Sequence, residues 1–380
     1  MIQTFDVIVA GVGGMGAQTC LRLAERGHRV LGLERFDIPH TFGSSHAVNR
    51  IIRLAYFEHP SYVPLLRRAY DLWRDLESRA GEQLLFITGS MDIGPTGSAV
   101  VEGSLASCRE HDLSHELLDP TEVMRRFPGY NLPAGYAAVF QGDGGFVASE
   151  RAIVAAVNLA MANGAVIRAR EPLIDHAPLP GGGVRVRTPK GTYEANRLVL
   201  SSGSWIGEHV PALARTAVPE RQVLGWFQPK KPAHFRVGAF PVSNLKCDVG
   251  HFYQFPVWHV PGFKIGRYHH LQETGTADGI SREPTRTDEA ILREGLRRFF
   301  PDANGDCLGM RACLFTNTPD EHFIIDALPG FREVIVASPC SGHGYKFASV
   351  MGEILADLAT GKRPPFDLSL FGIDRFTASA

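Results

Sequence analysis

The sequence predicts an α/β protein in which a domain built on a parallel sheet is interleaved with a second domain built on a mixed, more antiparallel sheet. Three observations lead to this fold class. Residues 5–34 follow the order strand, glycine-rich turn, helix and strand, which is typical of a βαβ unit. Short alternating strands gather at 221–267, as in antiparallel sheets. The length of 380 residues exceeds that of one small domain and favours two.

The N-terminal segment carries the most specific motif of the chain. An apolar, β-branched run at 5–10 is followed at once by glycines in G-x-G-x-x-G spacing at 11–16. A predicted helix over 17–26 leads to a second strand at 29–33, which ends on Glu34. Strand, glycine turn, helix, strand and acid together form a dinucleotide-binding fingerprint, whereas the glycines alone would be a weak signal.

Each part of the fingerprint has a physical role. Gly11 permits the tight turn out of the strand, and Gly13 lets a pyrophosphate approach the backbone. The helix N-terminus offers unpaired N–H groups to that anion, and Glu34 accepts hydrogen bonds from a ribose diol. NAD and FAD both contain the pyrophosphate and the ribose that these residues would bind. The position of the fingerprint at the start of the chain favours FAD. The cofactor contacts predicted here are Gly11, Gly13, Gly14, Met15, Gly16, Glu34 and Arg35.

Composition narrows the class of protein further. Hydrophobic residues make up 44% and charged residues 21%, which is ordinary for a soluble globular protein. The formal net charge of −1 argues against nucleic acid or an anionic membrane as an obligatory partner. No apolar run approaches the roughly 20 residues of a membrane helix, and the first strand leaves no room for a leader, so we expect a cytoplasmic protein. The six cysteines contain no C-x-x-C pair, so we predict no metal site.

Beyond Glu34, the first half of the chain alternates between the two expected sheets. Strong breakers make 35–46 a long loop. The elements that follow are a helix at 62–77, a strand pair at 84–94, helices at 100–111 and 119–128, a turn at 142–145, a helix at 149–164, a strand at 165–168 and an antiparallel meander at 184–188 and 191–195.

The second half leaves the parallel sheet and returns to it. A further apolar strand at 197–205 fits the sheet opened at 5–10. After it we predict strands at 223–228, 238–242, 251–255 and 263–267, a helix at 288–300, strands at 323–326 and 334–338, a glycine-rich turn at 341–346 and a helix at 347–360. The predicted domains are therefore 1–80, 145–215 and 320–380 for the cofactor, and 81–144 and 216–319 for the substrate.

Two of the groups that could carry chemistry are cationic. Arg50 and Arg53 follow the long loop directly, and two guanidiniums cannot be buried cheaply without anions. They indicate phosphate or carboxylate recognition, although surface ion pairs would explain the two residues alone. Lys346 lies in the turn Gly-His-Gly-Tyr-Lys, where it could lie over a site while the turn amides hold a polar ring edge.

The other two groups lie on predicted strands or beside them. Lys264 shares one face of its strand with Gly266 and Tyr268, because side chains alternate along a strand. Cys313 comes before a polar turn and a core strand, and a cysteine in such a place is by itself more often a core residue.

Several stretches together resemble the monomeric sarcosine oxidase family, which includes N-methyltryptophan oxidase and pipecolate oxidase. They are the fingerprint, the stretch from Pro-His-Thr at 39–41 to Arg-Ile-Ile-Arg at 50–53, the run Thr-Pro-Asp-Glu-His-Phe-Ile-Ile-Asp at 318–326, and Ser-Gly-His-Gly-Tyr-Lys-Phe at 341–347. The likeness covers nearly the whole chain in order.

The resemblance implies FAD attached through its 8α-methyl carbon to the thiol of Cys313. It implies that Arg50 lies by the flavin, that Arg53 and Lys346 bind the substrate carboxylate, and that Lys264 promotes the reaction with O₂. It also implies that Tyr253 and a histidine line the substrate pocket. Further expected cofactor contacts are Ser44, Arg50, Leu173, Gly203, Gly342, Gly344 and Lys346.

The sequence departs from the family pattern at the histidine. The family histidine follows the lysine by four residues, where this chain has Tyr268, with His269 and His270 next. Either a one-residue bulge restores a histidine, for which we select His269, or Tyr268 takes the role.

The function expected from these features is an FAD-dependent oxidase of a secondary amino acid, N-methyl or cyclic, which produces an imine and hydrogen peroxide. We expect a monomer whose partners are a small secondary amine with a carboxylate and O₂. Two alternatives stay open. One is an FAD-dependent dehydrogenase with another electron acceptor, and the other is a redox-inert flavin-binding protein.

Overall fold

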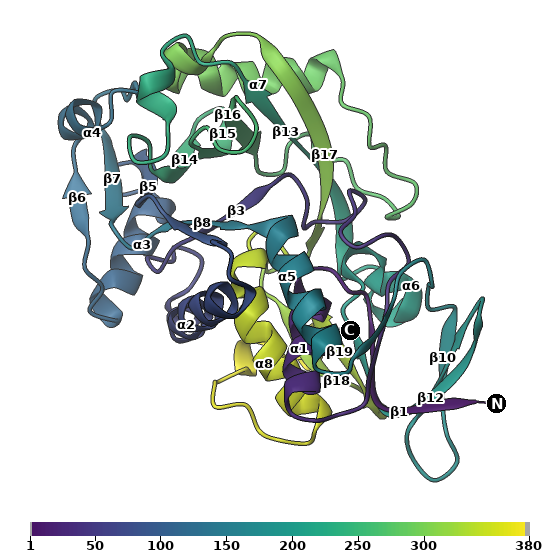
Figure 1. Cartoon of the computed structure of the whole chain (residues 1–380). Coiled ribbons are helices and arrows are strands. Elements are labelled where there is room, and N and C mark those ends of the chain that lie inside the picture. Colours follow the sequence, from purple (N-terminus) through teal and green to yellow (C-terminus); the bar gives the residue numbers. More distant parts are fainter. Residues whose placement is uncertain (1, 377–380) are drawn as a thin grey trace.

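Two eight-stranded sheets, joined by a small three-stranded sheet, form the frame of the computed structural model, which describes residues 2–376 (Figure 1). The fold is α/β, as predicted. Among the described residues, no helix combines the length and the apolar character needed to cross a bilayer.

The first sheet contains the predicted parallel core. Strand β1 pairs in parallel with β12 on one side and β2 on the other, so the carboxyl ends of all three strands meet at one edge. The main path is β10-β11-β12-β1-β2-β9, and β19 pairs with both β12 and β18. The strands are β1 Gln3–Ala10, β2 Val30–Leu33, β9 Val166–Arg168, β10 Asp175–Pro178, β11 Val184–Thr188, β12 Gly191–Leu200, β18 Ile324–Leu328 and β19 Phe331–Ser338.

Helices cover this sheet. Figure 1 shows α5 (Ser149–Ala162), α1 (Gly14–Glu25) and α8 (Ala348–Ala359) side by side, and α1 packs against both neighbours. Helix α2 (Val63–Ala80) packs on α8 and ends at Gly81, whose positive φ of 64° forms a left-handed cap. The apolar faces of these helices and of the sheet form the largest core cluster.

The second sheet has the order β17-β13-β16-β15-β14-β5-β7-β6 and is antiparallel except where β14 pairs with β5. A phenylalanine-rich core lies beneath it, together with α7 (Arg286–Phe299). Helix α7 begins with a capping box between Thr285 and Asp288. The strands are β5 Ser90–Pro95, β6 Glu116–Leu118, β7 Tyr136–Gln141, β13 Val218–Phe227, β14 Val242–Cys247, β15 Gly250–Phe255, β16 Phe263–Arg267 and β17 Cys307–Asn317.

A three-stranded sheet connects the two halves of the molecule (Figure 1). It has the order β3 (Asn49–Ile52), β8 (Gly145–Ala148) and β4 (Leu85–Ile87). The remaining helices are α3 Ala99–Glu110, α4 Pro120–Arg126 and the short α6 Ile206–His209. The strands of the first large sheet all come from the segments assigned to the cofactor domain, and those of the second from the substrate segments, which supports our proposed domain boundaries.

Three strand predictions need correction. The meander strand at 191–195 and the apolar strand at 197–205 are one strand, β12, whose first half pairs with β11 and whose last residues pair with β19. The strand predicted at 238–242 instead begins at Val242, because Gly238 has a φ of 87° and Phe240 turns into the core. The residues around Cys313 were assigned to no strand and form the long strand β17.

Candidate active site

A cavity of about 350 Å³ lies at the carboxyl ends of the first sheet. The turn after β1, the end of β2 and the residues after β12 all open onto it, as expected for a ligand site in an open α/β sheet. Most of the predicted cofactor residues line it, namely Gly11, Gly13, Gly14, Met15, Glu34, Arg35, Ser44, Arg50, Leu173, Gly203, Gly342 and Gly344.

The glycine turn has the geometry that the fingerprint requires. Gly11 has a φ of 95°, and a Cβ there would lie 2.5 Å from the carbonyl oxygen of Ser201, which directly follows the neighbouring strand β12. A Cβ on Gly16 would overlap the carbonyl oxygen of Gly11, so this position serves packing and does not line the cavity. A Cβ on Gly13 would meet no atom nearer than 3.9 Å, which leaves that side of the turn open to a ligand.

The start of α1 provides an anion site. The helix has Gly13 as its N-cap, which has no side chain to cap it, and no acidic residue in its first turn. The N–H of Gly14 makes only a long bond of 3.4 Å to Oγ of Ser45, so a phosphate could take its place. At the end of β2, the carboxylate of Glu34 accepts hydrogen bonds from the backbone N–H of Val12 (2.9 Å) and Phe36 (3.0 Å). These bonds fix its orientation at the cavity wall, where it can accept from a ribose diol.

A second cavity of about 50 Å³ adjoins the first. The two cavities share four lining residues, so a ligand that fills the larger one reaches the wall of the smaller one. The shared residues are Arg50, Phe315, Gly342 and Tyr345. The smaller cavity is lined in addition by Ile51, Tyr253, Phe255, Tyr268, Cys313, His343 and Lys346.

Two of the predicted cations line the smaller cavity directly. Arg50 is held to the backbone by hydrogen bonds from Nη2 to the Ser44 carbonyl (2.6 Å) and from Nη1 to the Asn49 carbonyl (2.9 Å). The Nζ of Lys346 donates to the His343 carbonyl at 2.7 Å. Burial and the positive charge of Arg53 together lower the pKa of Lys346 to about 7, although the carboxylates of Glu58 and Asp92 act in the opposite direction.

Arg53 lies just behind this cavity. Its guanidinium carbon is 4.4 Å from the ring centroid of Tyr56, and the Nζ of Lys346 is 5.2 Å from the same centroid. The structure thus brings Arg53 and Lys346 to one aromatic ring. Arg53 is itself paired with Glu58 and Asp92. Although burial disfavours the charged form of Arg53, the two carboxylates raise its pKa above the ordinary value.

Lys264 is buried at the base of the site. Its Nζ donates to the carbonyl oxygens of Ala47 (2.7 Å) and Asn49 (2.9 Å) and to the Asn49 side chain (2.7 Å), and it lies 4.2 Å from the ring centroid of Phe255. Burial lowers the pKa of Lys264, with Arg50 acting in the same direction. Three acceptors around one nitrogen are all satisfied only by an ammonium, so the hydrogen bonds favour the charged form.

Cys313 lies in the middle of β17 with its side chain at the smaller cavity. Burial raises the pKa of its thiol, whereas the charges of Arg50, Lys264 and Arg282 favour the thiolate. All six cysteines of the chain are free, and four of them are buried. Cys313 is the one that lines this cavity.

The structure corrects the selection of His269. Strand pairing continues one residue beyond β16, through a bond from the Tyr268 N–H to the His251 carbonyl, so Tyr268 keeps the inward direction and lines the cavity. His269 follows with a φ of 51° and turns away, between Glu220 (3.0 Å) and Glu321 (3.1 Å). Hydrogen bonds to these carboxylates raise the pKa of His269 to about 9.

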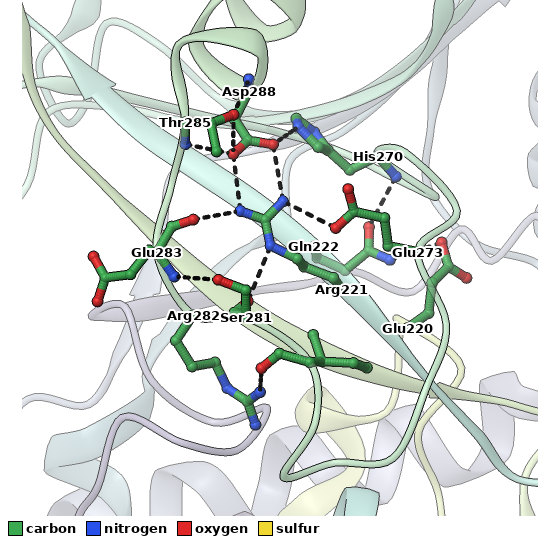
Figure 2. Close-up of polar contacts among 11 residues, drawn as sticks. Glu220, Arg221, Gln222, His270, Glu273, Ser281, Arg282, Glu283, Thr285 and Asp288 are labelled. Atoms are coloured by element: carbon green, nitrogen blue, oxygen red, sulfur yellow. Dashed lines mark hydrogen bonds and ion pairs between the residues drawn. The ribbon is translucent and has the colours of Figure 1, made fainter.

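His270 is also directed away from the cavities. Figure 2 shows its ring aimed at Asp288, and the Nε2–Oδ1 distance is 2.9 Å. The same carboxylate accepts hydrogen bonds from both terminal nitrogens of Arg221, at 2.9 and 2.8 Å. His270 therefore belongs to a buried network that fastens the segment after β16 to the start of α7.

Sequence reasoning missed several residues of the site. Asp92, which pairs with Arg53, is an acid in the apolar strand β5, and that position was its one signal. Tyr56 and His343 are joined by a hydrogen bond of 2.6 Å, and no spacing in the sequence indicated that pairing. The two residues are almost 290 positions apart in the sequence, and only the fold brings them together.

The chain belongs to the family of FAD dependent oxidoreductases (DAO), whose model matches residues 6–358. The open glycine turn, the uncapped helix and Glu34 fit the pyrophosphate and ribose of FAD. The protein is thus an FAD-dependent oxidoreductase.

Within that family the chain is similar to proteins with named activities. It is 38% identical over 380 residues to monomeric sarcosine oxidase of Bacillus sp. (strain NS-129), covering 99% of this chain and 98% of the relative. It is 35% identical over 377 residues to N-methyl-L-tryptophan oxidase of Salmonella typhi, covering 98% and 99%. The solved structure of NikD, an unusual amino acid oxidase essential for nikkomycin biosynthesis, matches with a TM-score of 0.85, 28% identity and 97% coverage of both chains.

Proposed function

We propose that the protein is an FAD-dependent oxidase of small secondary amino acids, N-methyl or cyclic, that produces an imine and hydrogen peroxide. The observation that carries this proposal is the pair of adjoining cavities. The larger fits FAD, and the smaller presents Lys346, with Arg53 behind it, where a carboxylate would bind. The named activities of the relatives support the same chemistry.

The chain's own residues would bind and orient the substrate. Lys346 and Arg53 would bind its carboxylate through charge-assisted hydrogen bonds. The surrounding positive charge of Arg50 and Lys264 would disfavour the ammonium form of its amine, so that the nitrogen is neutral when the neighbouring C–H bond breaks. FAD, when bound, would accept the electrons of that bond and pass them on to O₂. Lys264 would stabilise negative charge that develops beside it.

We further propose that FAD is attached covalently through Cys313. The thiol lines the smaller cavity next to Phe315, which borders both cavities, and three cations near it favour the thiolate. His269 is not part of this proposal, and Tyr268 takes the position beside Tyr253, with the two ring centroids 5.3 Å apart.

The size of the smaller cavity supports small substrates. A volume of about 50 Å³ has room for roughly three to five water molecules. An N-methyl or cyclic amino acid with few carbons fits this space, whereas an indole side chain needs the cavity to widen. We therefore propose higher kcat/KM for N-methylglycine, N-methylalanine and proline than for N-methyltryptophan.

Six free cysteines, four of them buried, support a protein that works in the reducing cytoplasm. The names of the sarcosine oxidase relatives support a monomer.

The test begins with the visible spectrum of the purified protein before and after denaturation in acid. We expect the yellow colour to stay with the polypeptide in the parent and to leave it in Cys313→Ala. A screen of secondary amino acids for bleaching and peroxide then follows. If the parent binds flavin but no secondary amine bleaches it, the oxidase proposal is rejected.

A further inference from the structure

The guanidinium of Arg53 is divided between two carboxylates. Its Nη2 donates to both oxygens of Glu58, at 3.0 and 2.9 Å, and its Nε donates to Oδ1 of Asp92 at 3.3 Å. Its Nη1 is buried and has no hydrogen-bond partner among residues 2–376. A buried N–H group without a partner is costly, and such a group in a site indicates a missing ligand.

Asp92 is the rigid member of this arrangement. It is 2% exposed and projects from β5. Its Oδ1 also accepts a hydrogen bond from Nδ2 of Asn244 on β14 (2.8 Å), and its Oδ2 accepts from Oγ of Ser104 on α3 (2.7 Å). Three donors, one on β14, one on α3 and one just after β3, therefore hold one carboxylate in place.

Glu58 differs from Asp92 in its surroundings. It lies in the connection after β3 rather than in a sheet, and 11% of its side chain is exposed, against 2% for Asp92. A side chain in a connection has more freedom than one in the middle of a sheet. Asp92 is thus the fixed reference for the plane of the Arg53 guanidinium.

We propose that Asp92 is a positioning residue for the substrate: it fixes the plane of Arg53 so that Nη1 stays free for the substrate carboxylate. This inference rests on the proposed function, because it assigns the carboxylate-binding role to Arg53. Asn244 and Ser104 act through Asp92 by holding its two oxygens. We call the four residues joined by these hydrogen bonds, Arg53, Asp92, Asn244 and Ser104, the arginine brace.

Two substitutions at Asp92 separate its position from its charge. Asp92→Asn keeps an oxygen that can accept from Arg53 and Asn244 but removes the negative charge. It should retain the position of Arg53, and the loss of a nearby anion should leave carboxylate affinity equal or higher. Asp92→Ala removes the acceptor and leaves Nε of Arg53 unsatisfied, so the guanidinium should rotate away from its productive plane.

The experiment measures the dissociation constant of acetate from the holoenzyme by its effect on the visible spectrum, at constant ionic strength. Acetate carries the carboxylate without the amine, so the measurement does not depend on turnover. We expect Asp92→Ala to weaken acetate binding and to raise KM by at least about tenfold, the scale of a lost charge-assisted hydrogen bond. We expect Asp92→Asn to bind acetate as tightly as the parent or more tightly.

Ser243→Ala is the matched control. Ser243 precedes Asn244 on β14, is equally buried and points to the opposite face of the sheet. It is hydrogen-bonded to Gln254 (2.6 Å) and Tyr130 (2.8 Å), so its loss also removes buried polar contacts. This variant should lose stability without a change in acetate affinity. If Asp92 had only a structural role, Asp92→Ala would give the same result as Ser243→Ala.

Parent-like acetate binding in a folded Asp92→Ala variant would overturn the inference, as would equal losses in Asp92→Asn and Asp92→Ala. If Asp92→Ala does not fold, Asn244→Ala decides the matter, with acetate binding about threefold weaker expected and unchanged binding contradicting the brace. The proposed function fails separately. In that case the parent binds acetate but oxidises no secondary amino acid.

Discussion

At the scale of the residue, the proposed carboxylate-binding role of Lys346 makes that binding depend on pH. Burial lowers its pKa to about 7, so the free enzyme loses this positive charge as the pH rises through that value. Acetate affinity should therefore be highest below pH 7 and fall by up to tenfold per pH unit above it. Acetate has no amine, so deprotonation of a substrate does not obscure the effect.

The control for this prediction is Lys346→Arg, which keeps its charge at all accessible pH values. Its acetate affinity should be flat across the same range, measured by the same spectral titration. A parent profile that is flat between pH 6 and 9 would show that Lys346 does not bind the carboxylate.

Lys264 provides the second prediction at this scale. Lys264→Met removes the buried ammonium but keeps a side chain of similar length. Reoxidation of the reduced enzyme by O₂ should slow by about 100-fold or more, the size of a lost electrostatic contribution in a water-excluded site. Stopped-flow absorbance measures this step. Reduction by the substrate and reoxidation by an artificial dye should change far less. Equal losses with both acceptors would favour the dehydrogenase alternative.

The sequence predicted residues at the site well where a motif fixed the backbone. The glycine turn and Glu34 line the cavity because their spacing constrains the chain on both sides. The choice of His269 was wrong because a single extra paired residue after β16 decides which side chain points inward. Asp92 was missed because its role comes from partners on three other segments of the chain.

At the scale of the element, the segment from 268 to 285 links the two cavities. Tyr268 at its start lines the smaller cavity. Asp278 in its second half accepts hydrogen bonds from Arg35 (2.7 Å) and Trp205 (2.8 Å), which line the larger cavity. The buried pair of Arg221 and Asp288 fastens this segment to β13 and α7 (Figure 2).

Breaking this pair should be costly. Arg221→Met leaves the carboxylate of Asp288 buried without its main partner, so the free energy of unfolding should fall by about 3–5 kcal/mol. Chemical denaturation measures this change. Arg282→Met in the same segment is the control, because Arg282 donates to backbone carbonyls and pairs with no carboxylate in the described hydrogen bonds. Equal losses in both variants would contradict the prediction.

Helices and strands were predicted best where the apolar residues of a segment follow a single helical or strand spacing. Helices α1, α2 and α8 have apolar stripes, and their bounds differ from the prediction by few residues. Strand β12 was divided in two because its halves have different neighbours, β11 on an exposed meander and β19 in the buried sheet. The sequence does not show which strands pair with each other, and that pairing is what makes both halves one strand.

At the scale of the whole molecule, the three-stranded sheet should make unfolding cooperative. It pairs β4, which precedes the second large sheet, with β8, which leads back to the first. We expect a single thermal transition in which far-ultraviolet circular dichroism, flavin absorbance and tryptophan fluorescence coincide. Trp73 and Trp205 report on the cofactor side, and Trp226 lies on β13 of the second sheet. Separate midpoints for these probes would show that the two halves unfold independently.

The wide sequence span of the larger cavity also has a consequence for biosynthesis. Its lining begins at Ala10 and ends at Tyr345, and β19 joins the first sheet only after residue 331. A ribosome has therefore made nine-tenths of the 380 residues before the FAD site can be complete. The glycine turn after β1 is therefore made long before the last residues that line the site, and FAD cannot meet its complete site until residues up to Tyr345 have been synthesised.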